Sequence, residues 1–186
     1  MKRISIIIAI FAFALTLPIE AKDQGVSKKE QKAAKRALEA QKDSIAGLVS
    51  RDAMERGEWV FNAVSVNVSG GPMVNVPSNL NFLMVEGDKY TFQTSSGFGG
   101  GPNNMGGITT TGLIKIEDVE ADRHGNITYS LRLNGTILNG TATLTLERNS
   151  NRADLYINMD RGTRNLSMVG AVYPIGTTRV FEGTLR

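Results

Sequence analysis

The sequence has 186 residues, no cysteine and a single histidine, His124. Without cysteine the chain cannot form disulfides, thiolate zinc sites or a cysteine nucleophile, and it cannot be lipidated through an N-terminal cysteine. A zinc site built from histidines needs at least two or three of them, so one histidine excludes that arrangement too. The composition therefore excludes thiol-dependent enzymes and zinc centres of these types, and we predict no metal and no cofactor.

Long hydrophobic runs are also missing. The most apolar stretch, Ile4–Leu17, has 14 residues, whereas a helix needs roughly 20 to span a bilayer. Lys2 and Arg3 precede the stretch, and the small residue Ala21 follows it just before a polar segment that begins at Lys22. This order is typical of a cleavable secretory signal rather than a retained anchor. We expect an exported protein, periplasmic or extracellular, with no stable membrane insertion after cleavage.

No strong excess of one charge is present. The chain has 21 Lys and Arg against 18 Asp and Glu, and its pI is about 9.3. The surplus lies in Lys22–Glu58, with nine basic and seven acidic residues, whereas Trp59–Arg186 has ten of each. A nucleic-acid-binding protein concentrates positive charge on one face, together with aromatic or arginine side chains that meet the bases. We therefore expect no nucleic-acid partner.

The segment Ser27–Glu55 has the features of a helix. Ser27 and Glu30 form the S-x-x-E pattern of a capping box, Gly57 is suited to a C-terminal stop, and Gly47 predicts fraying or a bend. The larger apolar residues fall near one face: Leu38, Ile45, Leu48 and Val49. Because this face is thin and rich in alanine, we expect the helix to add little to the core. It is a helix that lies on its own domain, a partly mobile leader or an interaction helix, and the thin face argues against binding to a membrane surface.

Beyond Gly57 the hydrophobic period changes to two, which indicates strands with one buried and one wet face. Strands are predicted at Trp59–Val68, Leu80–Val85, Lys89–Thr94, Gly112–Val119, Ile127–Leu133, Thr141–Glu147, Ala153–Asp160, Leu166–Tyr173 and Arg179–Thr184. The side chains expected inside are Tyr90, Phe92, Tyr129, Leu131, Leu144, Leu146, Leu155 and Ile157. Short turns between strands without intervening helices favour a mainly β fold, either an antiparallel β-sandwich or an up-and-down barrel, preceded by the N-terminal α-helix.

These patterns divide the chain into three parts. Residues 1–21 are the expected signal peptide, residues 22–57 the N-terminal helix or leader, and residues 58–186 one antiparallel β domain. A mature chain of this length can bury a core without disulfides, so the absence of cysteine is compatible with export.

Five stretches carry a resemblance to a known family: Trp59–Ala63, Leu83–Asp88, Gly106–Ile108, Asn151–Ile157 and Arg164–Gly170. Over about residues 59–172 the chain resembles the exported, Bacteroidetes-type domain of unknown function 4251. The resemblance implies an exported start, a helix rich in Lys and Ala, and a β-rich remainder. That family has no assigned activity, so the resemblance implies a compartment and a fold but no chemistry.

The most unusual segment is the glycine-rich Gly97–Gly107. A phosphate-binding loop would need a following helix and usually a Gly-Lys-Ser/Thr sequence, and neither is present. Two interpretations remain: a flexible loop between strands, or a loop that contacts a ligand or partner. In the second, Phe98 and Met105 supply the apolar contacts, because long loops are often functional. We predict that any ligand binds at the end of the β domain beside this segment.

His124 lies in a charged turn, which is a poor place for a catalytic triad that needs a dry, oriented histidine. The nearby carboxylates Glu117, Asp118, Glu120 and Asp122 lack the spacing of an EF-hand, and we interpret them as solvated charge at a strand edge.

With no catalytic set in view, we predict an exported non-catalytic binding or structural module for an unknown protein or small-molecule ligand. Such a chain is not expected to be an enzyme. The alternative is a hydrolase built from a pair of Asp or Glu residues that are distant in the sequence. A cluster of buried carboxylates in one cleft would favour that alternative.

Overall fold

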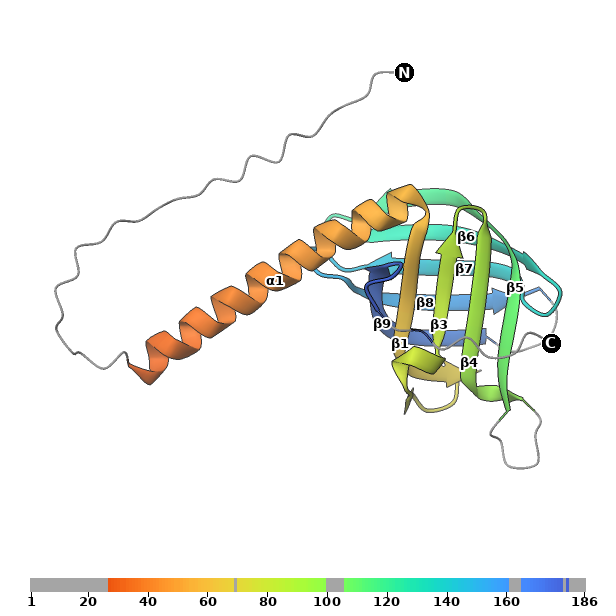
Figure 1. Ribbon diagram of the computed structural model, residues 1–186, viewed down its shortest axis with the longest axis horizontal. Coiled ribbons are helices and arrows are strands. Elements are labelled where there is room, and N and C mark those ends of the chain that lie inside the picture. Colours follow the sequence, from red (N-terminus) through yellow and green to blue (C-terminus); the bar gives the residue numbers. More distant parts are fainter. Residues whose placement is uncertain (1–26, 69, 100–105, 161–164, 179, 181–186) are drawn as a thin grey trace, which may run out of the picture.

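The computed structural model describes residues 27–68, 70–99, 106–160, 165–178 and 180, without the side chains of residues 96–99, 106 and 107. One helix is followed by strands (Figure 1). The elements are α1 (Lys28–Arg56), β1 (Glu58–Val68), β2 (Val74–Asn75), the short 3-10 turn η1 (Ser78–Leu80), β3 (Phe82–Glu86), β4 (Lys89–Gly99), β5 (Gly106–Ala121), β6 (Ile127–Gly135), β7 (Asn139–Leu146), β8 (Arg152–Met159) and β9 (Asn165–Pro174).

The strands form a closed antiparallel barrel. From β3 to β9 each strand pairs with the next along the chain, and β1 pairs with both β3 and β9, which closes the ring at eight strands. Strand β2 lies outside the ring and pairs only with β1. Of the two predicted architectures, the structure therefore has the up-and-down barrel rather than the sandwich of two sheets.

Alternation located most strands correctly, and the glycine-rich region shows the largest difference. Strand β4 continues beyond Thr94 to Gly99, and β5 already begins at Gly106. Strand β2 was not predicted, because two residues carry no periodicity. The strand expected at residues 179–184 lies outside the described residues except for Val180, which belongs to no strand.

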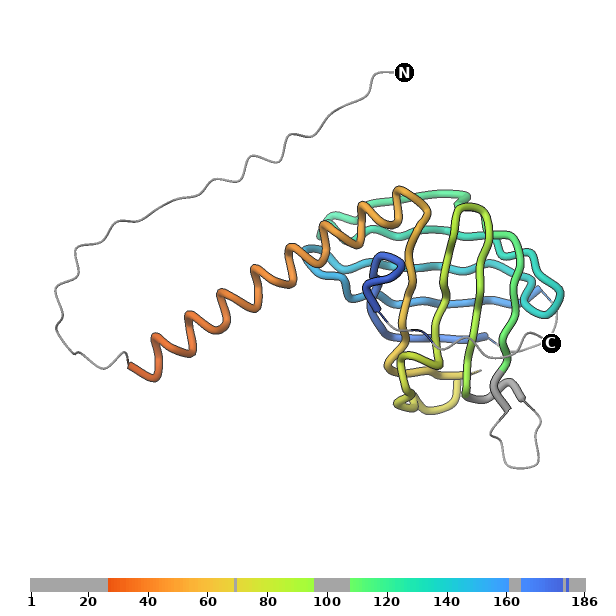
Figure 2. Tube along the Cα trace, in the orientation of Figure 1, coloured from red at the N-terminus to blue at the C-terminus, as the bar shows by residue number. Residues whose placement is uncertain are grey.

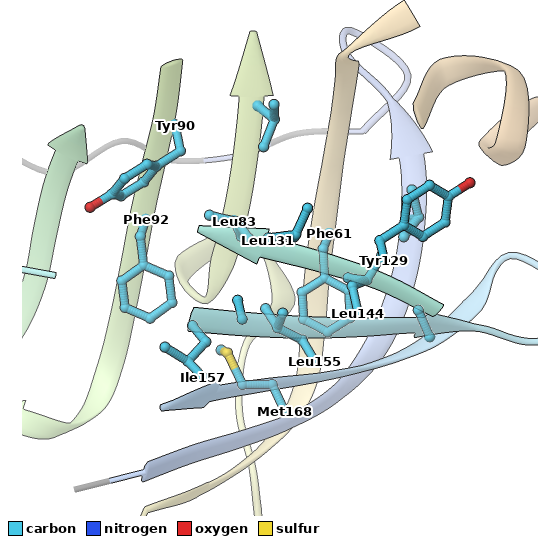
Figure 3. Packing of buried hydrophobic residues seen from close by; sticks show 14 of the residues in the cluster. Phe61, Leu83, Tyr90, Phe92, Tyr129, Leu131, Leu144, Leu155, Ile157 and Met168 are labelled. Carbon is cyan, nitrogen blue, oxygen red and sulfur yellow. The ribbon is translucent and has the colours of Figure 1, made fainter. Parts of the chain in front are cut away.

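Side chains fill the barrel (Figure 3). All eight residues predicted to point inward are at most 5% exposed. Their neighbours on β7 and β8 alternate with them, so that Leu144 and Leu155 are buried while Thr143 and Asp154 are exposed. An eight-stranded barrel has an interior just wide enough for side chains or one small ligand. Here the space is taken up by aromatic and leucine side chains.

The ends of α1 are formed as the sequence predicts. The Ser27 backbone N–H donates to Glu30 Oε2 at 2.9 Å, and the Glu30 backbone N–H donates to Ser27 Oγ at 3.3 Å, which completes the capping box. Gly57 terminates the helix with φ of 70°, a left-handed conformation that glycine adopts without steric cost. No helix in the described part of the chain has an apolar stretch long enough to cross a membrane.

The buried face of α1, by contrast, was predicted wrongly. The four larger apolar residues of the expected face are 43–65% exposed: Leu38, Ile45, Leu48 and Val49. The helix instead packs through small residues and one methionine: Gly47, Ser50, Ala53 and Met54. Ala53 and Met54 are fully buried and belong to the main core. The helix therefore contributes to the core through its last turns, while its N-terminal half projects away from the barrel (Figure 1).

Gly47 does not bend the helix but allows it to approach the barrel. A Cβ atom at this position would lie 2.7 Å from the backbone nitrogen of Ser150, in the turn between β7 and β8. Ser50 Oγ then donates to the Val172 carbonyl in β9 at 2.7 Å. Close backbone approach is a frequent reason for glycine in a helix, and it explains why a glycine stands at this position in α1.

A second apolar cluster lies on the outer surface of the barrel. Val60, Phe82 and Met84 point outward from β1 and β3 and are buried beneath Tyr173, Ile175 and Val180. Asn62 Nδ2 donates to Thr178 Oγ1 at 2.8 Å beside this cluster. The segment after β9 thus folds back over the outer face of β1 and β3.

Candidate functional site

The two ends of the barrel differ. The helix end carries α1, which contacts β9 and the turn between β7 and β8. The opposite end, here called the loop end, carries the β4–β5, β6–β7 and β8–β9 connections, because successive connections of an up-and-down barrel alternate between its ends. The trace in Figure 2 shows α1 beside one end only. The loop end is the end at which the sequence predicted a ligand site.

Neither predicted contact residue can be placed as a side chain. Phe98 lies in β4, but its side chain is outside the described residues, and so is the whole of Met105. Gly99 pairs with Gly106 after a shift of register that begins at Thr94. The connection between β4 and β5 is therefore residues 100–105, which is shorter than the predicted loop and also lies outside the described residues.

Asn81 explains how this part of β4 is held. It is fully buried, and its Oδ1 accepts from Thr94 Oγ1 at 3.1 Å and from the Ser95 backbone N–H at 2.9 Å. Its Nδ2 donates to Ser95 Oγ and to the Pro77 carbonyl, both at 2.9 Å. One buried amide thus holds β4 just beyond the last residue pair of β3 and β4, Phe82 with Gln93. A buried polar group satisfied in this way fixes local geometry.

A small apolar pocket lies at the loop end, with a volume of about 40 Å³. Phe92 comes from β4, Ile108 and Thr110 from β5, and Met159 from the end of β8. The remaining lining residues are Ile137 and Leu138, in the connection between β6 and β7. Ile137 is 48% exposed and Leu138 is 1% exposed, so the lining joins a surface residue to a buried one. An apolar pair in a hairpin turn, where polar residues are usual, is a signal that sequence reasoning missed.

Tyr90 connects this turn to the barrel wall. Its hydroxyl donates to the Leu138 carbonyl at 2.6 Å, and its ring passes close to Gly112 and Gly135, where an added Cβ would clash with it. Burial raises the pKa of Tyr90 to about 12. The phenol is therefore neutral at physiological pH and remains a donor that holds the β6–β7 connection in place.

The size of the pocket limits what it can accept. Ligand sites for whole small molecules have volumes of roughly 300–1,000 Å³, far above the 40 Å³ found here. A volume of this size has room for a few water molecules at most or for the tip of one apolar group. The packed barrel is thus suited to surface contact at its end rather than to enclosing a metabolite.

His124 lies where the sequence predicted, at the exposed tip of the β5–β6 hairpin. Asp122 Oδ1 accepts from the backbone N–H groups of His124 at 2.8 Å and of Asn126 at 2.9 Å. Slight desolvation acts in the opposite direction, but these hydrogen bonds hold the pKa of Asp122 below its usual range. The cluster is an ordered turn, since Asp side chains commonly satisfy backbone donors in this way.

Acidic side chains are not gathered into a catalytic cleft in the described part of the chain. No Asp or Glu there is buried, and no group of three potential metal ligands occurs among those residues. Glu117, Asp118 and Glu120 are exposed along β5, as expected for solvated edge charge. No observation therefore favours the carboxylate-dependent hydrolase.

A wider, open groove lies on the outer surface of the barrel, with a volume of about 720 Å³. Most of its lining residues have polar side chains, and the full set is Glu86, Lys89, Tyr90, Thr91, Thr111, Gly112, Leu113, Asn134, Gly135, Thr136 and Asn139. These polar side chains alternate with the buried ones along β4 and β5, so the groove is formed by the outward faces of strands where the sheet curves. No described buried polar side chain is aimed into it without a partner.

Comparison with known proteins identifies the family but no activity. A model of the domain of unknown function 4251 matches residues 47–172. The fold is similar to the 1.95 Å crystal structure of a protein of that family from Bacteroides eggerthii DSM 20697, with a TM-score of 0.64 and 26% sequence identity. That match covers 75% of this chain and 94% of the other. No curated protein matches this chain significantly. The chain belongs to the DUF4251 family.

Proposed function

We propose that the protein is an exported, non-catalytic binding module that contacts a protein or small molecule at the loop end of its barrel. The observation that carries this proposal is the apolar pocket beside the half-exposed Ile137. The pocket is small and mostly apolar, and one of its lining residues lies at the surface, so it could accept the tip of a partner's apolar group. The helix end is not equivalent, because α1 packs there.

The chemistry of the loop end supports contact rather than catalysis. The pocket is lined by Thr110 and five apolar residues, so it offers burial of apolar surface. Buried apolar area of this kind contributes about 25 cal/mol per Å². A partner that inserts one side chain or one alkyl group would gain affinity from this pocket and further contacts from the surrounding loops.

Export rests on the N-terminal pattern. If the signal is cleaved after Ala21, the mature protein begins at Lys22 or within a few residues of it. Mass spectrometry of the protein recovered from outside the cytoplasm measures this directly. An intact Met1 on that protein would contradict export through a cleaved signal.

The loop-end site can be tested by photo-crosslinking in the host cell. A photoreactive phenylalanine analogue replaces Ile137, and a matched protein carries the same analogue at Leu113, which is 54% exposed on the outer face of β5. We expect an adduct from position 137 and none from position 113. The mass of the adduct separates a protein partner from a small molecule. Equal labelling at both positions, or none at 137, would contradict the proposal.

A further inference from the structure

Strand β5 has an unpaired edge in its second half. The strand pairs with β4 only as far as Leu113, and the Ile114 backbone N–H then donates to Asp88 O at 2.8 Å. From Lys115 to Ala121 the pairing is with β6 alone, and no described residue pairs with the other edge of this stretch. All seven of its residues are exposed. An exposed edge of this kind presents backbone donors and acceptors to an added strand.

The inner face of the same stretch is apolar and open. Ile116 pairs with Leu131 and Val119 pairs with Tyr129, and directly paired residues point to the same side of a sheet. Leu131 and Tyr129 are buried in the barrel, yet Ile116 is 43% exposed and Val119 is 50% exposed. Both side chains point toward the inside of the barrel, but they remain exposed because no described strand pairs with this edge of β5 to cover them. A strand added to this edge would lie alongside them and cover them.

The outer face is acidic, and its charge decides which partner fits. Asp118 and Glu120 pair with Ser130 and Thr128, and their side chains lie on the outer side. Glu117 lies at the shift of register between Ile116 and Asp118. Lys115 is the only base in the stretch. Two copies that paired this edge about a two-fold axis would bring these carboxylates together, and like charges across a strand pair are destabilising. A basic strand would instead find complementary charge.

We propose that the edge Lys115–Ala121 is a docking site for an extended, basic peptide segment of a partner, which adds a strand to the barrel beside β5. Backbone pairing supplies affinity in this mode of recognition, and side chains on alternate faces supply specificity. The partner's apolar side chains lie over Ile116 and Val119, and its Lys or Arg side chains lie near Asp118 and Glu120. This surface is distinct from the loop-end site and does not depend on it.

Peptide binding to the full mature chain tests the proposal. The probe is a fluorescent heptapeptide of alternating Lys and Val, and anisotropy measures its dissociation constant. We expect saturable binding that weakens as salt screens the charges. A peptide in which Pro replaces Val keeps the charge but loses alternate backbone donors, and a Glu–Val peptide reverses the charge. Both should bind at least about tenfold more weakly.

Variants assign binding to the edge. The double variant Asp118→Lys/Glu120→Lys should weaken the Lys–Val peptide about tenfold or more, whereas Glu147→Lys/Asp154→Lys makes the same change of charge at exposed positions elsewhere and should not. Ile116→Thr/Val119→Thr should weaken binding without changing the melting temperature, because both residues are half exposed.

Several outcomes would overturn the docking site. Equal binding of the Lys–Pro peptide would reduce the effect to charge attraction, and absence of Lys–Val binding would remove the site altogether. If the chain dimerises in gel filtration and Asp118→Lys/Glu120→Lys alters the dimer, a second copy occupies the edge. Ile137→Asp should leave peptide binding unchanged, so the loop-end proposal can fail without affecting this one.

Discussion

The strands of the barrel and helix α1 use apolar residues in opposite ways. Along β7 and β8 the large apolar residues mark the buried face, so that Leu144 and Leu155 lie inside. Along α1 the large apolar residues other than Met54 lie outside, and Leu48 is 65% exposed while Gly47 and Ser50 are buried. The positions of large apolar residues therefore identify the buried face of the strands but not the buried face of α1.

The difference follows from what each element packs against. A strand in a closed barrel faces an interior that must be filled, so large side chains go inward. The second half of α1 lies against backbone at the helix end, where the turn holding Ser150 and the end of β9 leave little room at Gly47 and Ser50. Only in the last turns does a large side chain, Met54, reach the main core. The first half of α1 lies against no strand and buries nothing.

The largest effect should come from charging the interior of a strand. Leu144→Asp places a carboxylate at a fully buried position, where no partner is available, and we expect a loss of about 4 kcal/mol or more in the free energy of unfolding. Thr143→Asp, one residue away on the exposed face, should cost less than about 1 kcal/mol. Urea melts of the two variants measure the difference. Similar losses would mean that the two faces of β7 are not distinct.

What each element packs against also explains which sequence predictions were accurate. Alternation identified the inward set on β4, β6, β7 and β8 because one face of each strand meets a filled core. Alternation could not identify the face of α1 that packs on the barrel, because that face depends on the backbone opposite it. It also could not show that Ile116 and Val119 point inward yet remain exposed, because this depends on where the pairing of β5 with β4 ends. The lining of the loop-end pocket likewise comes from segments that only the closed barrel brings together.

The next effect concerns Gly47. Replacing glycine by alanine inside a helix normally stabilises it by up to about 1 kcal/mol, but here the new Cβ would lie 2.7 Å and 2.8 Å from backbone atoms of Ser150. We expect Gly47→Ala to destabilise the protein by about 1–3 kcal/mol, because the helix must move away from the barrel. The matched variant Ala40→Gly, in the exposed half of the helix, should cost about 1 kcal/mol through propensity alone. A stabilised Gly47→Ala variant would show that α1 does not pack as described.

A smaller effect is expected at Tyr90, where the interior contains a polar group. Tyr90→Phe removes the donor to the Leu138 carbonyl and should cost about 1–2 kcal/mol at neutral pH. Since the folded pKa is raised to about 12 from 10, the wild type should lose stability as pH rises from 10 to 12, when only the unfolded tyrosine is deprotonated.

The Phe variant should show less of this loss. Part of it should remain because burial, with a further contribution from Glu55, also raises the pKa of Tyr129. Urea melts across this pH range give the slopes, and Tyr156→Phe on the exposed face of β8 is the control at neutral pH. Equal slopes for the wild type and Tyr90→Phe would contradict a buried phenol at this position.

The smallest effect should come from the apolar stripe of α1, and it tests the comparison most directly. Ile45→Ser/Leu48→Ser removes two large apolar side chains that are 55% and 65% exposed, so little burial is lost and the free energy of unfolding should change by less than about 1 kcal/mol. Met54→Ser removes a single side chain of similar size that is fully buried in the main core, and it should cost about 2–5 kcal/mol. If the double variant unfolded as readily as Met54→Ser, the stripe would be buried in the folded protein, and the outward orientation of this face of α1 would be wrong.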